Sequence, residues 1–222
     1  MNDIQQEVSM QHQSPQPTIG GAFREGWQTL WMDLPRLLII WLIYIAVGLT
    51  GVLGVHYLFG DGIGNDISSG LVSMLFSILV SWPLFFGLCK LFLNIVRRRE
   101  VQVGQIFDGF LRLPSIVFAA IIITVSTTVG LIFFVVPGVI IFCKLILTPF
   151  LMMDKDLNGW DAVALSWQIT SGHTGQIILI VMLAGCIMFM GMLLFGIGII
   201  PAWIWVVLTI ASFYNTLTAE RD

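Results

Sequence analysis

Residues 71–96 read LVSMLFSILVSWPLFFGLCKLFLNIV, and the four residues that follow read RRRE. Lys90 is the only charged residue in this apolar stretch. A helix rises about 1.5 Å per residue, so about 20 residues cross the hydrocarbon core of a membrane. The stretch is longer than a span requires, and Pro83 within it predicts a kink or an end that protrudes from the membrane.

The composition of the whole chain excludes a water-soluble globule. Of its 222 residues, 57% are hydrophobic and 10% are charged, whereas soluble domains carry about 25% charged residues. With so few charges, most of the surface must face lipid. The net charge of −3 and the lack of a basic domain exclude nucleic acid as a partner. The expected partners are membrane lipids and, as a further option, another membrane protein.

Apolar runs before and after this stretch predict that the chain crosses the membrane six times. The expected fold class is all-α, a six-span integral membrane helix bundle. The fourth run is the shortest, so it would need a locally thinner membrane or burial inside the bundle. The six predicted spans are Leu37–Phe59, Leu71–Val96, Ile116–Val136, Val139–Met153, Ile177–Ile200 and Ala202 to about Leu217.

The basic residues predict the orientation of these spans, because cytoplasmic segments are enriched in Lys and Arg. Residues 60–70 contain no basic residue, and the turns at 136–138 and 196–201 contain no charge at all. We therefore expect three outward hairpin tips and two cytoplasmic termini. The residues on the cytoplasmic side are Arg24, Arg36, Arg97, Arg98, Arg99, Arg112, Lys155 and Arg221.

Each pair of spans follows a segment with the pattern of an amphipathic helix that lies along the membrane surface. Apolar residues recur at helical spacing in these segments, so one face would contact acyl chains and the other the headgroups. Aromatic side chains, Trp above all, favour this depth. The predicted interfacial anchors are Trp27, Trp31, Phe110, Trp160 and Trp167.

The chain is also expected to contain three repeats, each an interfacial helix followed by a two-span hairpin. The second spans match one another as PLFFGLCKLFLN at 83–94, PGVIIFCKLILT at 137–148 and PAWIWVVLTIAS at 201–212. Such units would surround a pseudo-threefold axis in one membrane domain. The expected boundaries are 19–100, 101–156 and 157–222, after a polar, disordered cytoplasmic tail at 1–18.

Residues 136–172 read VPGVIIFCKLILTPFLMMDKDLNGWDAVALSWQITSG. This stretch resembles the membrane domain that accompanies some glycerophosphoryl diester phosphodiesterases, and it is similar to the YciC-type bacterial inner-membrane proteins. The likeness extends loosely over residues 20–218. It implies a six-span protein of the bacterial cytoplasmic (inner) membrane without an established activity. The phosphodiesterase activity is not implied, because the sequence holds no such catalytic domain.

Two lysines inside predicted spans are the first candidates for function. Lys90 and Lys144 occupy matched positions of the second and fourth spans, and Leu208 takes the equivalent place in the sixth. An ionised lysine in the membrane core costs several kcal/mol, and no Asp or Glu lies within any span. One hypothesis is that the pair binds an anionic group, such as a lipid phosphate, in a shared crevice. The alternative is that each ammonium reaches the nearer membrane interface.

Other charged and reactive residues carry weaker signals. The triplet Arg97, Arg98 and Arg99 indicates either a topology determinant or a contact with anionic lipid. Three cysteines in apolar runs, with no CxxC or CxxH spacing, indicate small buried side chains and neither a disulfide framework nor a metal site. No nucleophile elbow, HExxH motif or P-loop is present. We therefore predict no catalytic residue, no metal and no cofactor.

These observations leave two functional interpretations. The first is a non-enzymatic scaffold, accessory or membrane-homeostasis protein that packs against lipid and a membrane-protein partner. The second is a lipid or amphiphile binding or transport protein that uses Lys90 and Lys144. A proton-driven carrier is disfavoured, because such carriers need a carboxylate or histidine relay inside the membrane. The scaffold interpretation does not explain why the two lysines occupy matched positions.

Overall fold

The computed structural model describes residues 18–59, 75, 77–193 and 198–219. Within these residues the protein is all-α and has no strand, as the sequence predicts. Six segments are long and apolar enough to cross a membrane, which confirms the predicted number of spans. They are Leu34–Gly51, Ile78–Val96, Val103–Phe133, Val135–Asp154, Thr174–Leu193 and Ile199–Ala219.

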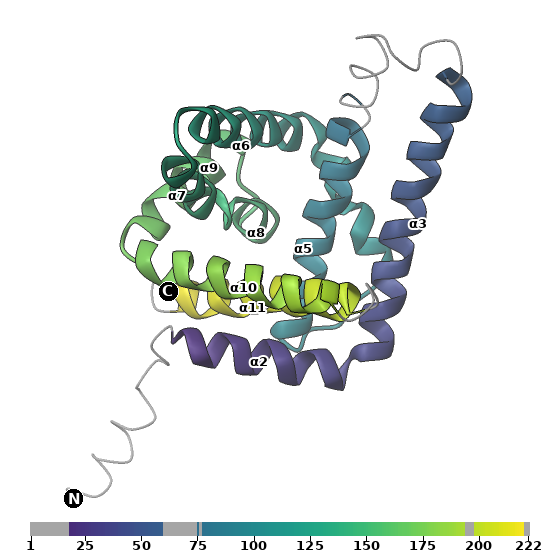
Figure 1. Cartoon of the computed structure of the whole chain (residues 1–222). Helices are drawn as coiled ribbons and strands as arrows, with labels where there is room; N and C mark the ends of the chain where they lie inside the picture. The colour runs from purple at the N-terminus through teal and green to yellow at the C-terminus, as the bar shows by residue number, and fades with distance from the viewer. Residues whose placement is uncertain (1–17, 60–74, 76, 194–197, 220–222) are drawn as a thin grey trace, which may run out of the picture.

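The helices form three hairpins, and a shorter helical segment precedes each one. The first hairpin is α3 with α5, the second is α6 with α7 and α8, and the third is α10 with α11 (Figure 1). The preceding segments are α2, η2 and α9. The bounds are α2 Ile19–Met32, α3 Leu34–Phe59, α5 Trp82–Val96, η2 Val103–Arg112, α6 Leu113–Phe133, α7 Val135–Leu145, α8 Thr148–Asp154, α9 Gly159–Ser171, α10 Thr174–Leu193 and α11 Ile199–Ala219.

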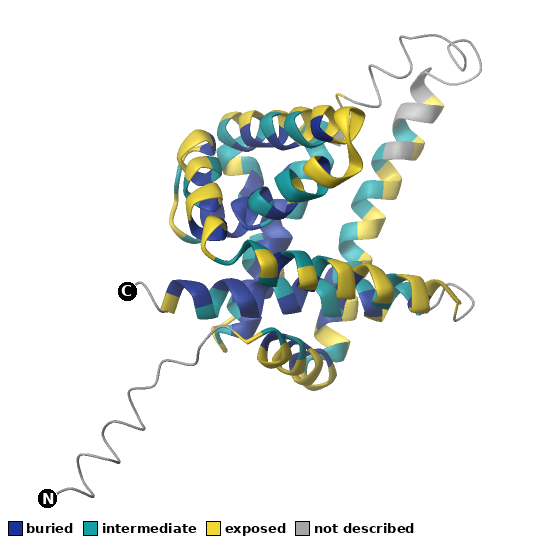
Figure 2. Ribbon diagram, turned by 60° about the vertical axis from the view of Figure 1, so that its left-hand side comes forward, coloured by how far each residue is buried: buried dark blue, intermediate teal, exposed yellow. Residues whose placement is uncertain are grey.

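The first and third hairpins run in different directions. Helices α3 and α5 run along the vertical axis of Figure 1, whereas α10 and α11 run across them, and Figure 2 retains this crossing after a turn about the same axis. No single membrane normal can therefore be parallel to all six spans. At least one hairpin must tilt relative to a common membrane normal.

The short segments connect the hairpins into a ring. Each packs on the second span of the hairpin before it: η2 on α5, and α9 on α7 and α8. The first segment closes the ring, because α2 packs along α11 of the last hairpin. This cyclic order is the one that three units around a pseudo-threefold axis would have. The three sequence repeats themselves stay a prediction.

The core lies where the second spans meet, and the first spans are largely exposed. Buried positions concentrate on α5, α8 and α11, whereas α3 stands apart from the other helices (Figure 2). Cys89 and Cys143 are buried, as expected for small apolar side chains. Cys186 is exposed, and the expectation of burial was wrong there because α10 turns most of its apolar surface outward.

Two predicted details of the second hairpin are wrong. The turn falls at Phe134, whose backbone is extended, and not at residues 136–138. Pro137 and Gly138 lie in the first turn of α7, where a proline needs no hydrogen-bonding N–H. The fourth span is two helices with a break between Leu145 and Thr148, and Pro149 follows at the start of α8. The charged outer tip expected within residues 60–70 lies outside the described residues.

The interruption expected at Pro83 is present as a change of helix type. A π-helical turn, η1 (Ser77–Ser81), precedes α5, and Pro83 lies at the start of the regular helix. The proline lacks an N–H and its ring crowds the preceding turn, so the regular α-helical ladder cannot run through it.

Segment η2 differs from the amphipathic α-helix that we expected along the membrane surface. It is a 3-10 helix that runs antiparallel beside α5, so that Gln105 lies by Asn94 and Gly109 by Pro83. Two glycines permit this approach. A Cβ on Gly87 would overlap the carbonyl group of Ile106, and a Cβ on Gly109 would overlap that of Pro83.

We expect Gly109→Ala to destabilise the protein strongly, because its methyl group would push η2 away from the α5 backbone. Overpacking of this kind costs about 1–3 kcal/mol or more. Gly104→Ala is the matched control in the same segment, since a Cβ there has open space around it. SDS titration of each variant in micelles measures the free energy of unfolding. Equal values for the two alanine variants would show that η2 is not held against α5 in this way.

Candidate functional site at the junction of the three hairpins

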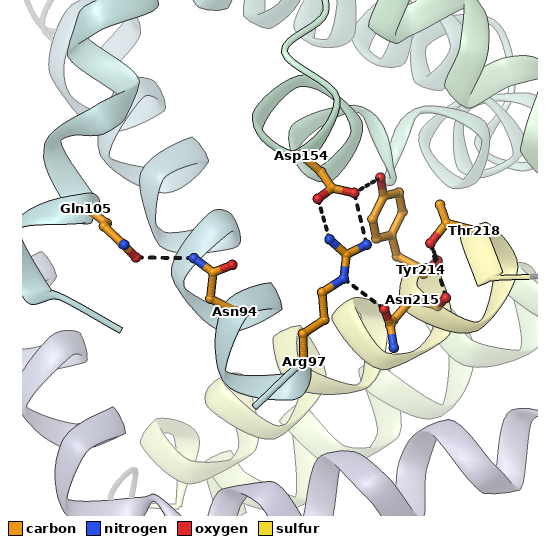
Figure 3. A network of polar contacts seen from close by, with 7 residues as sticks. All are labelled: Asn94, Arg97, Gln105, Asp154, Tyr214, Asn215 and Thr218. Atoms are coloured by element: carbon orange, nitrogen blue, oxygen red, sulfur yellow. Dashed lines mark hydrogen bonds and ion pairs between the residues drawn. The ribbon is translucent and has the colours of Figure 1, made fainter. Parts of the chain in front are cut away.

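An arginine–aspartate pair joins the ends of the first and second hairpins. Arg97 follows the last residue of α5, and Asp154 is the last residue of α8. The guanidinium group donates to both carboxylate oxygens of Asp154: Nη2 lies 2.9 Å from Oδ2, and Nη1 pairs with Oδ1 (Figure 3). The two side chains are only 16% and 15% exposed. This is the bidentate geometry in which arginine binds a carboxylate most strongly.

The third hairpin completes this cluster through α11. The Tyr214 hydroxyl donates to Asp154 Oδ2 at 2.8 Å, and Arg97 Nε donates to the Asn215 side-chain oxygen at 2.9 Å (Figure 3). The Tyr214 ring is fully buried, stacks on Phe150 at 5.7 Å between centres, and lies beneath the guanidinium group. We call Arg97, Asp154, Tyr214 and Asn215 the junction cluster. All three hairpins contribute to it.

Local helix ends bring these residues together. The backbone N–H of Arg97 donates to the carbonyl of Leu93, and Arg98 then adopts a left-handed conformation with φ 55°. The chain turns away there, so Arg97 stays at the carboxyl end of α5, where the helix dipole favours a cation. Asp154 has no such help from its own helix. Its charge is offset by Arg97 and by the Tyr214 hydroxyl.

A polar contact also lies at each of the three junctions in the ring. Lys90 of α5 forms an ion pair of 2.7 Å with Asp108 of η2. Lys144 of α7 donates to the Ser171 hydroxyl at 2.9 Å, at the end of α9. At the closing junction, the Ser212 hydroxyl of α11 donates to the Glu25 carboxylate of α2. Each second span is thus linked by a side chain to the short segment of the next unit.

The structure thereby accounts for the matched lysines. Lys90 and Lys144 each reach the segment that follows their own hairpin, and no contact among the described residues joins the two lysines. Lys90 has an acidic partner, Asp108, which belongs to η2 and lies outside the spans predicted from sequence. Lys144 has a hydroxyl partner instead, and its ammonium group lies 4.6 Å from the centre of the Trp167 ring. A cation over an aromatic face is attracted by the ring.

The remaining predicted site residues lie at the periphery. Arg98 reaches Met32 at the end of α2, with 3.7 Å between Nη2 and the sulfur, and it is exposed whereas Arg97 is half-buried. Arg99 is exposed. Trp31 and Trp160 expose about 60% of their area, as an anchor in the membrane interface would. The other three predicted anchors pack more closely: Trp27 on Trp205, Trp167 on Lys144 and Phe110 against the core.

The chemistry of the junction cluster suits a structural role. Its charges cancel, and its side chains bond to one another across three hairpins. Among the described residues, no group of three or more His, Cys, Asp or Glu side chains could hold a metal ion. Sequence reasoning found Arg97 only as one of three arginines. A signal for Asp154 was present, since it ends the apolar run before Lys155, but nothing in the sequence showed which residue would pair with it.

Comparison with known proteins adds no family to this description. No family model matches the chain, and neither a curated protein nor a solved structure does so. The class of protein that the helices define is therefore the finding at this level: a polytopic, all-α membrane protein.

We expect Asp154→Asn to destabilise the protein by about 3 kcal/mol, because it leaves the half-buried Arg97 charge without its counterion. The matched control is Asp156→Asn. Asp156 pairs with Arg112 at the surface, where it is 75% exposed, and such pairs contribute less than about 1 kcal/mol. SDS-induced unfolding of both variants tests the difference. Similar stability of the two would mean that the junction cluster does not hold the hairpins together.

Proposed function

We propose that the protein is a non-enzymatic scaffold, accessory or membrane-homeostasis component of the bacterial cytoplasmic membrane, with both termini in the cytoplasm. The observation that carries this proposal is the use of the polar side chains. The charged groups at the ring junctions and in the junction cluster bond to other side chains of the protein, and many large apolar side chains on the spans are exposed. Such a surface suits contact with lipid and with other spans.

The orientation and the family are part of the same proposal. The positive-inside rule supports cytoplasmic termini, and the meeting of α5, α8 and α11 at one end supports the return of all three hairpins to one side. The resemblance of residues 136–172 to YciC-type proteins supports the bacterial inner membrane as the location.

Helix α3 supplies the surface that a partner would use. Only 11% of the span Leu34–Gly51 is buried, and Leu42, Leu49 and Leu53 are exposed along the helix. Gly48 lies on a neighbouring face of α3, beside a pocket that Ile45 and Leu84 also line, and a Cβ at this position would meet no atom within 4 Å. Small residues let helix backbones approach closely inside a membrane, where packing and not water exclusion drives association.

The test of the scaffold proposal is purification in a gentle detergent, followed by mass spectrometry of everything retained. We expect a stoichiometric membrane-protein partner with the wild type and a loss of most of it with Gly48→Leu, because the new side chain would fill the approach to α3. Gly185→Leu is the matched control, since a Cβ on Gly185 of α10 would likewise meet no atom within 4 Å. It should retain the partner.

Two outcomes would contradict the proposal in different ways. A wild-type protein that retains no stoichiometric protein argues against a scaffold role altogether. Equal partner yields from the two leucine variants leave the scaffold role standing and exclude this face of α3 as its docking surface.

The second candidate function is lipid or amphiphile binding, and one observation favours it at Lys144 rather than at Lys90. The Lys90 charge is already neutralised by Asp108, whereas the contacts of Lys144 are an uncharged hydroxyl and an aromatic ring. A partly exposed ammonium of this kind retains its positive charge for a phosphate.

Under this second function, Lys144→Met should reduce the anionic lipid that co-purifies with the protein by about fivefold, as the loss of one basic contact predicts. Lys90→Met is the comparison: it removes a lysine whose charge is already offset, so lipid retention should stay near wild type. Quantitative lipid mass spectrometry gives both values. An unchanged lipid yield in Lys144→Met would exclude this role for Lys144.

A further inference from the structure

A pocket lies where the ring closes, between α2 and α11. It has a volume of about 380 Å³ and is lined by Phe23, Arg24, Trp27 and Trp205. The atoms that line it are apolar, and the pocket is open to the outside. None of the sites described above includes it, and it lies apart from the contacts of Lys90 and Lys144.

The aromatic walls of this pocket are fixed in place. The Trp205 indole N–H donates to the Phe23 carbonyl at 3.1 Å, so its polar atom is already satisfied by α2. The Phe23 ring stands edge-on to Trp205 at 6.0 Å, and the Trp27 ring lies 4.7 Å from it. Three rings from two helices thus form a rigid apolar surface, which loses little conformational entropy when a ligand binds.

Arg24 gives this surface a positive charge. It is exposed, and it forms no hydrogen bond or ion pair with another of the described residues. The adjacent Glu25 carboxylate accepts a hydrogen bond from Ser212 of α11 and forms no ion pair with Arg24. Arg36, by contrast, has Asp33 at 3.5 Å. An arginine with five free donors is well suited to bind phosphate oxygens.

We propose that this pocket binds an anionic phospholipid, with the phosphate at Arg24 and the upper acyl chain against Phe23, Trp27 and Trp205. The combination of one cation and apolar walls matches the two parts of such a molecule. Exposed Trp31 continues the aromatic surface along α2, with its ring 5.6 Å from that of Trp27. A soluble phosphate compound could contact the arginine, but it has no apolar part that would contact the aromatic rings. The site is independent of whether the protein is a scaffold.

The probe for this site is dioleoyl phosphatidylglycerol, offered to the full-length detergent-solubilised protein beside dioleoyl phosphatidylcholine. Native mass spectrometry counts the lipids retained. We expect Arg24→Gln to lower phosphatidylglycerol binding by about fivefold and to leave phosphatidylcholine unchanged. Arg24→Lys should retain most of the binding, because it keeps the charge. Arg36→Gln is the matched control, since it removes an arginine beyond the pocket.

A second pair of variants tests the apolar wall. Trp27→Ala should lower phosphatidylglycerol retention, whereas Trp160→Ala, which removes an exposed tryptophan from α9, should not. The proposal is overturned if Arg24→Gln and Arg36→Gln bind equal amounts of phosphatidylglycerol, or if the wild type retains both lipids equally. Both readouts concern lipid alone, so their failure leaves the scaffold proposal untouched.

Discussion

The pairing of Arg97 with Asp154 is the interaction on which the arrangement of the three hairpins depends. Two charges at the ends of apolar helices are costly unless they pair in good geometry. Here Tyr214 also donates to the Asp154 carboxylate, and Arg97 also donates to Asn215. Lipid-embedded helices gain little from hydrophobic association, because lipid is as apolar as their side chains. Many arrangements of the helices would be equally apolar, but only one brings these polar groups together, so the polar contacts select that arrangement. The pair contributes specificity more than net stability.

The ring of contacts extends the same principle around the molecule. Each junction combines a polar contact with close packing: Lys90 with Asp108 between α5 and η2, Lys144 with Ser171 between α7 and α9. At the first of these, Gly87 and Gly109 let two backbones interlock. The polar contact fixes the register of η2 along α5, and the glycines allow the two backbones to approach closely. The last junction returns to α2, so the three junctions form a closed cycle of contacts.

The parts of this structure that sequence could predict are those set by neighbouring residues. The number of spans follows from the lengths of apolar runs, and the interruption near Pro83 follows from the missing N–H. The hairpin turn at Phe134 was misplaced because proline at 137 also fits a first helical turn. The partner of Arg97 could not be predicted, since Asp154 lies 57 positions away and any cytoplasmic carboxylate was a candidate. The path of η2 along α5 could not be predicted either, because it depends on tertiary contacts that the spacing of apolar residues does not encode.

The direction in which polar groups point connects this architecture to function. Lys90 pairs with Asp108 and Arg97 with Asp154, so the free energy of these two pairings holds the fold and is not available to bind a ligand. What the molecule presents outward is the apolar face of α3 and the aromatic surface of α2 with its arginine. Under the proposed scaffold role, such a protein would act through its contacts in the plane of the membrane. Its specificity would then depend on positions such as Gly48 and Arg24, where a small residue or a charge interrupts an apolar surface.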